Sequence, residues 1–271
     1  MTPRTLRAME AAFFDLDKTV IAKASMVAFG KPLYRAGLIS RWIVLRALWG
    51  QLVYLQIGHS DAQMERSRAA VLRLTKGWDQ AKVSEIVRDA LNEVIEPIVY
   101  AEALALLRFH KDQGRRVFIV SASPIEVVAP LAAYLEVDDA IATRAQIDAH
   151  GRYTGEVEFS SHGTNKVIAM NELAERYDLD LSRSWAYSDS VTDLPMLEAV
   201  GHPVAVNPDR ELRKAATDRT WDILTFTLEV PLRSRGSMPS PGQAAAGAVG
   251  LVSVGTAFAA WWYLRRPKHR A

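Results

Sequence analysis

Two carboxylates stand two residues apart near the start of this 271-residue chain. Asp15 and Asp17 follow the apolar run over residues 11–14, and Thr19 comes two residues later. Acids at this spacing can converge on one phosphoryl group, because one carboxylate can attack phosphorus while the other protonates the leaving oxygen. Their mutual repulsion and the charge of a phosphate favour bound Mg²⁺, a hard ion that takes carboxylate, water and substrate oxygens. The alternative is a loop in which Asp17 or Thr19 caps a helix.

A hydroxyl and a lysine later in the chain suit the same chemistry. Ser121 and Ala122 follow the apolar run over 117–120. A hydroxyl and backbone N–H groups at a helix start can hold phosphate oxygens there, although Ser121 could instead be a helix N-cap. Lys166 opens a predicted helix, where a cation is unfavourable because the N-terminal end of the helix dipole is positive. A nearby anion would resolve that conflict, and an exposed lysine is the alternative.

A second pair of acids follows another apolar run, over residues 184–188. Asp189 could ligate the metal directly, with Asp193 supporting it or orienting Lys166. The alternative for Asp193 is a helix N-cap.

The runs that precede these groups alternate with helical stretches. The predicted strands cover residues 11–16, 116–121, 184–188 and 203–206, with shorter strand-like pieces within 140–159. The predicted helices cover residues 101–112, 124–135, 166–177 and 194–199. This alternation predicts an α/β fold with a doubly wound parallel sheet. Ligands bind at the carboxyl ends of such strands, so the acids, the hydroxyl and the lysine should meet at one edge of the sheet.

Between the first two strands lies a segment too long for one crossover. It contains predicted helices over 38–57 and 80–95, and we interpret residues 21–99 as a helical cap inserted into a catalytic core formed by 1–20 and 100–230. Residues 231–243 are rich in Pro, Ser, Gly and Arg, which predicts a linker.

The C-terminal region favours a membrane anchor. Residues 244–264 carry no charge over about 21 positions, roughly the length that spans a bilayer, and a basic tail follows over 265–271. We therefore expect contact with membrane lipid and a membrane-associated enzyme whose catalytic domain is cytoplasmic; a buried core helix is the alternative. The basic tail favours a cytoplasmic C-terminus, which conflicts with a single span. Glycines in the segment could also permit helix packing in a homodimer.

Composition excludes some classes of function. A net charge of only +2 argues against nucleic acid as a partner, since a binding footprint needs Lys and Arg clustered on one face. The chain has no cysteine, which excludes disulfides, thiolate metal sites and cysteine nucleophiles.

The ordered set of acid pair, hydroxyl, lysine and acid pair resembles the haloacid dehalogenase superfamily over about residues 10–210. The resemblance implies that Asp15 is the nucleophile and Asp17 the general acid and base. Asp17 would also give a backbone carbonyl to Mg²⁺, Asp15 and Asp189 would be metal ligands, and Asp193 would support the metal. The implied substrate-binding residues are Thr19, Ser121, Ala122 and Lys166. Asp17 favours phosphatase over dehalogenase chemistry, so the expected substrate is a phosphomonoester.

A helical insert directly after the first motif resembles the phosphoserine phosphatase-like branch, subfamily IB. Three positions depart from phosphoserine phosphatases: Ala24 stands where they carry an amine-binding Glu, Ser121-Ala122-Ser123 replaces Ser-Gly-Gly, and Thr192 replaces an Asn. The apolar, aromatic stretch over 42–55 is either an ordinary buried face or a surface that meets lipid. We therefore expect a lipid-linked or small-metabolite phosphomonoester. The alternatives are phosphoserine, phosphoryl transfer to another alcohol, and a non-catalytic membrane-tethered binding module.

Overall fold

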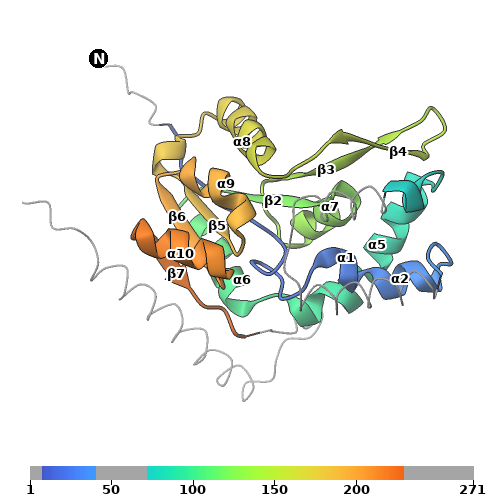
Figure 1. The fold of residues 1–271 in the computed structure, drawn as a ribbon, viewed down its shortest axis with the longest axis horizontal. Coiled ribbons are helices and arrows are strands. Elements are labelled where there is room, and N and C mark those ends of the chain that lie inside the picture. Colours follow the sequence, from blue (N-terminus) through green and yellow to red (C-terminus); the bar gives the residue numbers. More distant parts are fainter. Residues whose placement is uncertain (1–7, 41–71, 229–271) are drawn as a thin grey trace, which may run out of the picture.

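The computed structural model describes residues 8–40 and 72–228. Within these ranges, seven strands form one sheet in the order β4-β3-β2-β1-β5-β6-β7 (Figure 1). The strands are β1 (Ala11–Phe14), β2 (Arg116–Pro124), β3 (Asp139–Ile147), β4 (Tyr153–Phe159), β5 (Trp185–Ser188), β6 (His202–Val206) and β7 (Asp222–Leu224). The α/β fold is therefore confirmed, with β1 at the centre between β2 and β5.

The prediction of a parallel sheet holds for every pair of neighbouring strands except one. β4 runs antiparallel to β3. A short turn joins them, in which the N–H of Gly151 donates to the carbonyl of Asp148 and Gly151 has a φ of 75°. A parallel partner would need a crossover of a dozen or more residues, so the turn dictates a hairpin.

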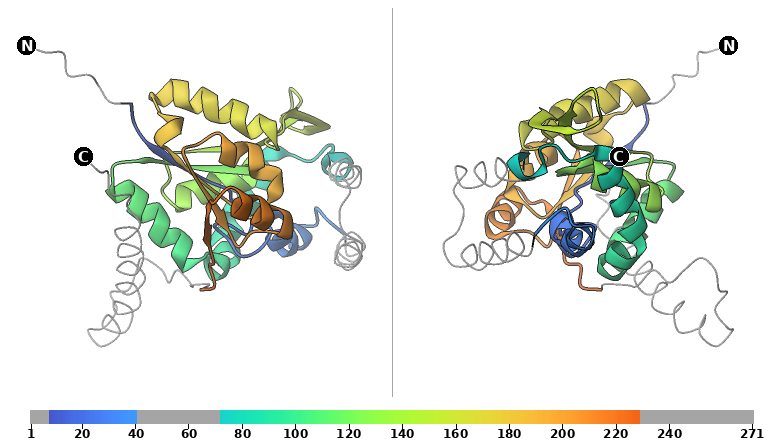
Figure 2. Two further views of the ribbon diagram at one scale, coloured as in Figure 1. Left: turned by 60° about the vertical axis from the view of Figure 1, so that its left-hand side comes forward. Right: turned by 90° about the vertical axis from the view of Figure 1, so that its right-hand side faces the viewer.

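Helices cover both faces of the sheet (Figures 1 and 2). The side chains of β1 alternate between two cores: Ala12 and Phe14 enter one, and Ala11 and Phe13 enter the other. Both faces of the strand are thus buried, which explains its uninterrupted apolar sequence. The first core also holds apolar residues of α6 (Ala101–Asp112) and α7 (Ile125–Tyr134). The second holds those of α8 (Thr164–Tyr177), α9 (Leu194–Glu198) and α10 (Arg210–Asp218).

The insert leaves and rejoins the core at one place. Ile21 and Val99 form an antiparallel bridge, and the N–H of Ala22 donates to the carbonyl of Ile98 at 2.7 Å. The described part of the insert contains α1 (Ser25–Ala28), α2 (Gly30–Arg35), α5 (Gln80–Ile95) and the 3-10 helix η1 (Glu96–Ile98). The helix predicted over 80–95 is confirmed. Of the helix predicted over 38–57, only 38–40 are described, and these are not helical.

Far from its ends, the insert also pairs with the hairpin. The N–H of Gly77 donates to the carbonyl of Tyr153 at 2.8 Å, and the N–H of Tyr153 donates to the carbonyl of Trp78 at 3.0 Å. Gln80 then donates from its side chain to Glu126 of α7 at 2.8 Å. The insert is therefore held to the core at several separated points.

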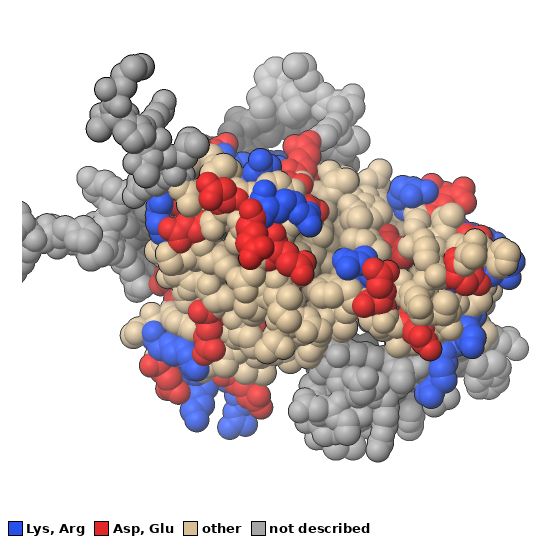
Figure 3. Space-filling view, turned by 90° about the horizontal axis from the view of Figure 1, so that it is seen from above, with Lys and Arg blue, Asp and Glu red and all other residues tan. Residues whose placement is uncertain are grey.

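Charges of both signs are interspersed over the face seen in Figure 3. Exposed ion pairs on the surface join Arg144 to Glu158 and Arg176 to Asp139, each at 3.5 Å. Exposed pairs of this kind contribute little to stability.

None of the helices within 8–40 and 72–228 has the length and apolar character needed to cross a membrane. The predicted linker, membrane segment and basic tail, over 231–271, lie outside the described residues. The apolar stretch over 42–55 does so as well.

Candidate active site

Three neighbouring parallel strands bring the predicted site residues to one edge of the sheet. Asp15 follows β1, Ser121 lies near the end of β2, and Asp189 follows β5. The N–H of Asp15 donates to the carbonyl of Tyr187 at 2.9 Å, which extends the pairing of β1 with β5 to the first acid. The expectation that these groups meet at the carboxyl ends of the strands is thus correct.

Lys166 connects the two acid pairs. Its Nζ lies 2.8 Å from Oδ1 of Asp15 and 2.7 Å from Oδ1 of Asp193, and its side chain is only 2% exposed. Oγ of Ser188 donates to Oδ2 of Asp193 at 2.7 Å. Burial lowers the pKa of Lys166, but the charges of Asp15 and Asp193 outweigh burial and hold that pKa above its ordinary value. The cation at the start of α8 is therefore matched by anions, as the helix dipole required.

Neither Asp193 nor Ser121 caps a helix with its side chain. Asp193 occupies the N-cap position of α9 but makes no capping hydrogen bond, because its carboxylate accepts from Lys166 and Ser188 instead. Ser121 is not an N-cap, since β2 continues to Pro124 before α7 begins.

The surroundings of Asp15 and Asp189 disfavour the ionised form of each carboxyl group. Burial raises the pKa of Asp15, and the neighbouring charges of Asp193 and Asp189 raise it further, against the opposing effect of Lys166. Burial also raises the pKa of Asp189 to about 7, and Asp193 and Asp209 add to this while Lys18 opposes it. Each acid would be more easily ionised beside another cation.

This donor set fits Mg²⁺. Within 8–40 and 72–228, no three side chains of His, Cys, Asp or Glu gather as a metal site. Mg²⁺ does not need such a cage, since it is commonly held by one or two carboxylates, waters and substrate phosphate. Asp15, Asp189 and the backbone carbonyl of Asp17 would supply hard oxygen donors of that kind.

The last residues of β2 supply hydroxyls and N–H groups. Oγ of Ser121 accepts from the N–H of Ser123 at 3.1 Å, and a hydroxyl that accepts one bond can still donate its own hydrogen to a phosphoryl oxygen. Oγ1 of Thr143 donates to the carbonyl of Ala122 at 2.7 Å, which fixes the peptide that follows Ala122. Nothing in the sequence pattern singles out Thr143 for this contact.

Asp17 and Thr19 have different surroundings. Asp17 accepts hydrogen bonds from Ser25 and Ser123, so it meets the first N–H of α1, in part as the capping alternative supposed. Thr19 is buried, and its hydroxyl has no hydrogen-bond partner among the described residues. Its role as a substrate-binding residue stays a prediction.

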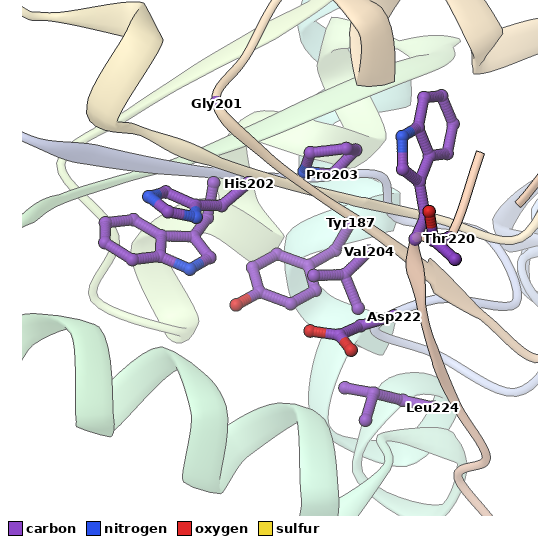
Figure 4. Close-up of a pocket in the computed structure, with 10 residues that line it drawn as sticks. Tyr187, Gly201, His202, Pro203, Val204, Thr220, Asp222 and Leu224 are labelled. Carbon is purple, nitrogen blue, oxygen red and sulfur yellow. The ribbon is translucent and has the colours of Figure 1, made fainter. Parts of the chain in front are cut away.

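A cavity of about 260 Å³ lies away from these residues (Figure 4). It is lined by residues of β5, β6 and β7 and of the loops that lead into β6 and β7, and at the starts of β5 and β6 Trp185 and His202 stack with ring centroids 4.3 Å apart. Because the three strands are parallel, their starts lie at the end opposite to Asp15 and Asp189. The cavity is therefore not part of the candidate active site.

Comparison with known proteins matches the sequence of this chain to a family. The sequence pattern of haloacid dehalogenase-like hydrolases matches residues 12–198. A Streptomyces azureus protein named "Inhibition of morphological differentiation protein" is 47% identical over 268 residues, covering 97% of this chain and 95% of the relative. A protein of Mycobacterium tuberculosis named a probable phosphatase is 46% identical over 263 residues, covering 96% and 91%.

A more distant relative and a solved structure extend the comparison. A phosphoserine phosphatase of Mycobacterium tuberculosis is 34% identical over 244 residues, which covers 89% of this chain and 77% of the relative. The crystal structure of a protein with unknown function from Bordetella pertussis has a TM-score of 0.69 and 29% identity, covering 80% of this chain and 99% of that one.

Proposed function

Because this chain belongs to the haloacid dehalogenase-like hydrolase family, we propose that it is a Mg²⁺-dependent phosphomonoester hydrolase that forms an aspartyl phosphate on Asp15. One observation carries the proposal: Asp15 projects from the end of the central strand to within 2.8 Å of a buried lysine, which a second acid also contacts. A nucleophilic carboxylate needs such a cation beside it to receive the charge of a phosphate.

The first half of the reaction follows from the placement of these groups. A carboxylate oxygen of Asp15 forms a bond to phosphorus as the bond from phosphorus to the leaving oxygen breaks. Asp17 gives its proton to that oxygen, so the alcohol departs uncharged. Lys166 and the hydroxyl of Ser121 bind the oxygens of the transferring group, and Mg²⁺ bound at Asp15 and Asp189 would offset its negative charge.

The second half regenerates the enzyme. Water attacks phosphorus and gives its proton to Asp17, which is now ionised. The bond between phosphorus and the Asp15 oxygen breaks, so inorganic phosphate leaves and both acids return to their starting states. Asp193 takes no part in bond changes; it holds Lys166 in place through the contact at 2.7 Å.

For the substrate, we propose a phosphomonoester whose alcohol is lipid-linked. Support comes from apolar side chains that α1 and α2 leave exposed: Met26 by 38%, Val27 by 57% and Tyr34 by 48%. The same α1 begins with Ser25, which contacts Asp17 of the candidate site. Lys23 and Lys31 line a groove on the same part of the insert and could meet anionic headgroups. Ala24 offers no carboxylate for an amine.

Phosphoserine is the second candidate, because a relative covering most of the chain is named a phosphoserine phosphatase. Phosphate release should be measured from a panel that contains lysophosphatidate, phosphoserine and small sugar phosphates, with and without Mg²⁺. A marked preference for phosphoserine would refute the lipid-linked substrate. Adding acceptor alcohols to the same assay would reveal transfer of the phosphoryl group to an alcohol instead of water.

The covalent step has a direct test. The enzyme should be mixed with labelled phosphomonoester, quenched in acid and treated with hydroxylamine, which cleaves acyl phosphates. We expect one hydroxylamine-sensitive label on the unsubstituted enzyme and none on Asp15→Asn. Turnover that survives in Asp15→Asn would contradict the proposal, and a complete lack of turnover across the panel would favour a binding protein that keeps the fold.

We also propose that residues 244–264 attach the enzyme to a membrane. Support comes from the sequence alone, which has no charge over this stretch. A chain truncated after residue 230 should move from the membrane fraction to the supernatant while keeping its activity on a short-chain substrate. Equal partition of both forms would refute the anchor.

A further inference from the structure

A partly buried cluster of hydrogen bonds surrounds the carboxylate of Asp17. Oδ1 accepts from the N–H of Ser25 at 2.8 Å. Oδ2 accepts from Oγ of Ser123 at 2.9 Å and from Oγ of Ser25 at 3.3 Å, and the two serine Oγ atoms lie 2.8 Å apart. Ser25 is 0% exposed and Ser123 is 6% exposed, so water competes little for these bonds.

The three members come from separate parts of the chain. Asp17 follows β1, Ser123 lies near the end of β2, and Ser25 is the first residue of α1 in the insert. Both oxygens of the carboxylate have donors, and these donors sit on different elements. Rotation of the carboxylate about its side-chain torsions would break bonds on both sides, so the cluster fixes its plane.

Helix capping explains only part of this arrangement. Asp17 does accept from the first N–H of α1, as a capping residue would. Capping does not involve Ser123, however, which belongs to the core and donates to the other oxygen of the same carboxylate. A pair of buried hydroxyls directed at one carboxylate oxygen therefore indicates that its orientation matters.

We propose that Ser25 and Ser123 are positioning residues that hold Asp17 in the orientation from which it protonates the leaving oxygen. This inference rests on the proposed function, in which Asp17 is the general acid. In that step the bond from phosphorus to the leaving oxygen breaks, the Asp15 oxygen bonds to phosphorus, and the proton of Asp17 moves to the departing oxygen. Proton transfer of this kind is sensitive to the distance and direction of the donor.

Because Ser25 lies in the insert, the orientation of Asp17 depends on where the insert sits. Two of the donor contacts to Asp17 come from Ser25, one from its backbone and one from its side chain. The general acid is therefore correctly oriented only when the start of α1 is seated against the core. The insert contributes to proton transfer through this residue without touching phosphorus.

Leaving groups of different basicity test the proposal. An alkyl phosphate needs protonation of its leaving oxygen, whereas p-nitrophenyl phosphate releases a stable anion that needs little help. We expect Ser123→Ala and Ser25→Ala to lower kcat/KM, which reports formation of the aspartyl phosphate and not its later hydrolysis, by about tenfold or more on an alkyl phosphate and by less than about threefold on p-nitrophenyl phosphate. Competitive inhibition by inorganic phosphate should change little, because phosphate binding involves Ser121 and Lys166.

Three further variants distinguish a positioning role of the two serines from a purely structural role. Ser184→Ala removes another buried serine, one that bonds Ala11 and Asp180 and not Asp17, and it should affect both esters equally. Ser123→Thr keeps a hydroxyl and should recover much of the activity on the alkyl phosphate. In an Asp17→Asn background, Ser123→Ala should add less than about a twofold loss, because the two residues act as a unit.

The outcomes separate this inference from the proposed function. Equal losses on the two esters, or full additivity with Asp17→Asn, would overturn the positioning role while leaving an active Asp15-dependent phosphatase. If the unsubstituted enzyme showed no Asp15-dependent turnover, the proposed function and this inference would fail together. Should Ser123→Ala not fold, Ser25→Ala in the same two-ester assay decides the matter.

Discussion

The ammonium group of Lys166 lies 2.8 Å from Oδ1 of Asp15, and neither side chain has more than marginal contact with solvent. This pair joins the end of β1 to the start of α8 at the edge of the sheet that holds the candidate active site. Because Asp193 contacts the same ammonium group, removing the lysine leaves two buried carboxylates without their cation. Stability and the proposed catalysis therefore depend on the same side chain.

Lys166→Met should lower the free energy of unfolding by roughly 3–5 kcal/mol, because it leaves buried charges unpaired. Turnover should fall by at least about 100-fold, since a donor to the transition-state charge is lost. Urea unfolding monitored by circular dichroism measures the first effect, and phosphate release the second. Lys166→Met combined with Asp15→Asn should recover part of the stability and none of the activity. A single variant as stable as the unsubstituted protein would contradict this account.

Mg²⁺ should stabilise the protein against heat through Asp15 and Asp189. At a Mg²⁺ concentration about 100 times the Kd, the gain is roughly 2.7 kcal/mol. Burial raises the pKa of Asp189 to about 7, so protons compete with Mg²⁺ and the gain should shrink as the pH falls below 7. Scanning calorimetry with and without Mg²⁺ at pH 8 and pH 5.5 measures this. Asp189→Asn should lose the Mg²⁺ effect at both pH values, and a full effect in that variant would exclude Asp189 as a ligand.

His110 should make the protein sensitive to acid at a site away from the chemistry. Burial, with the charges of Arg115 and His202, lowers the pKa of His110 from 6.5 to about 3, and its Nε2 lies 2.8 Å from the hydroxyl of Tyr187. The unfolded chain binds this proton more readily, so stability is lost as the pH falls from 6.5 towards 3. The loss between pH 7 and pH 4 is roughly 3 kcal/mol. Urea unfolding at both pH values should show a smaller difference for His110→Gln, and an unchanged difference would refute this.

Gly201→Ala should destabilise the fold by roughly 2–3 kcal/mol, because the added Cβ would overlap the carbonyl oxygen of Ser182 and a backbone must move. Gly30→Ala is the matched control. A Cβ at Gly30 meets no atom of the described residues within 4 Å, and it lies at the start of α2. Its effect should be near zero or slightly stabilising. Equal effects in the two variants, measured as Tm, would show that Gly201 is not constrained by contact.

Much of the fold could be predicted because its elements carry strong local signals. The helices over 80–95 and 101–112 were predicted with the bounds that the structure has. β7 was missed because three residues carry too little periodicity. α10 was missed although Asp209 caps it, accepting from the N–H of Leu212 at 2.7 Å, which is an ordinary sequence signal for a helix start. Strand direction in the hairpin could not be read from the alternation of apolar residues.

Two kinds of signal made part of the candidate site predictable: polar residues at the ends of predicted strands, and a charged residue in an unfavourable place on a helix. The unfavourable position of Lys166 at a helix start indicated an anion, and the structure supplies two. Ser25 had no such signal, because a serine beside Ala24 in the insert is unremarkable until the chain folds back on Asp17. Ser123 belongs to the Ser121-Ala122-Ser123 motif, yet its hydrogen-bond partner, Asp17, lies 106 residues away along the sequence. Contacts between residues so far apart in the sequence are set by tertiary packing, which the local pattern of a single sequence does not reveal.

The bridge between Ile21 and Val99 has a consequence for how such enzymes diverge. The chain leaves the core and returns to it through neighbouring backbone positions, so both ends of the insert meet at one junction. Material can be added, removed or exchanged between those positions during evolution without altering the length or order of the strands. New substrates can thus be acquired by changing the insert while the acids and the lysine stay where they are. Ser25 limits that freedom, because any replacement must present a comparable donor to Asp17.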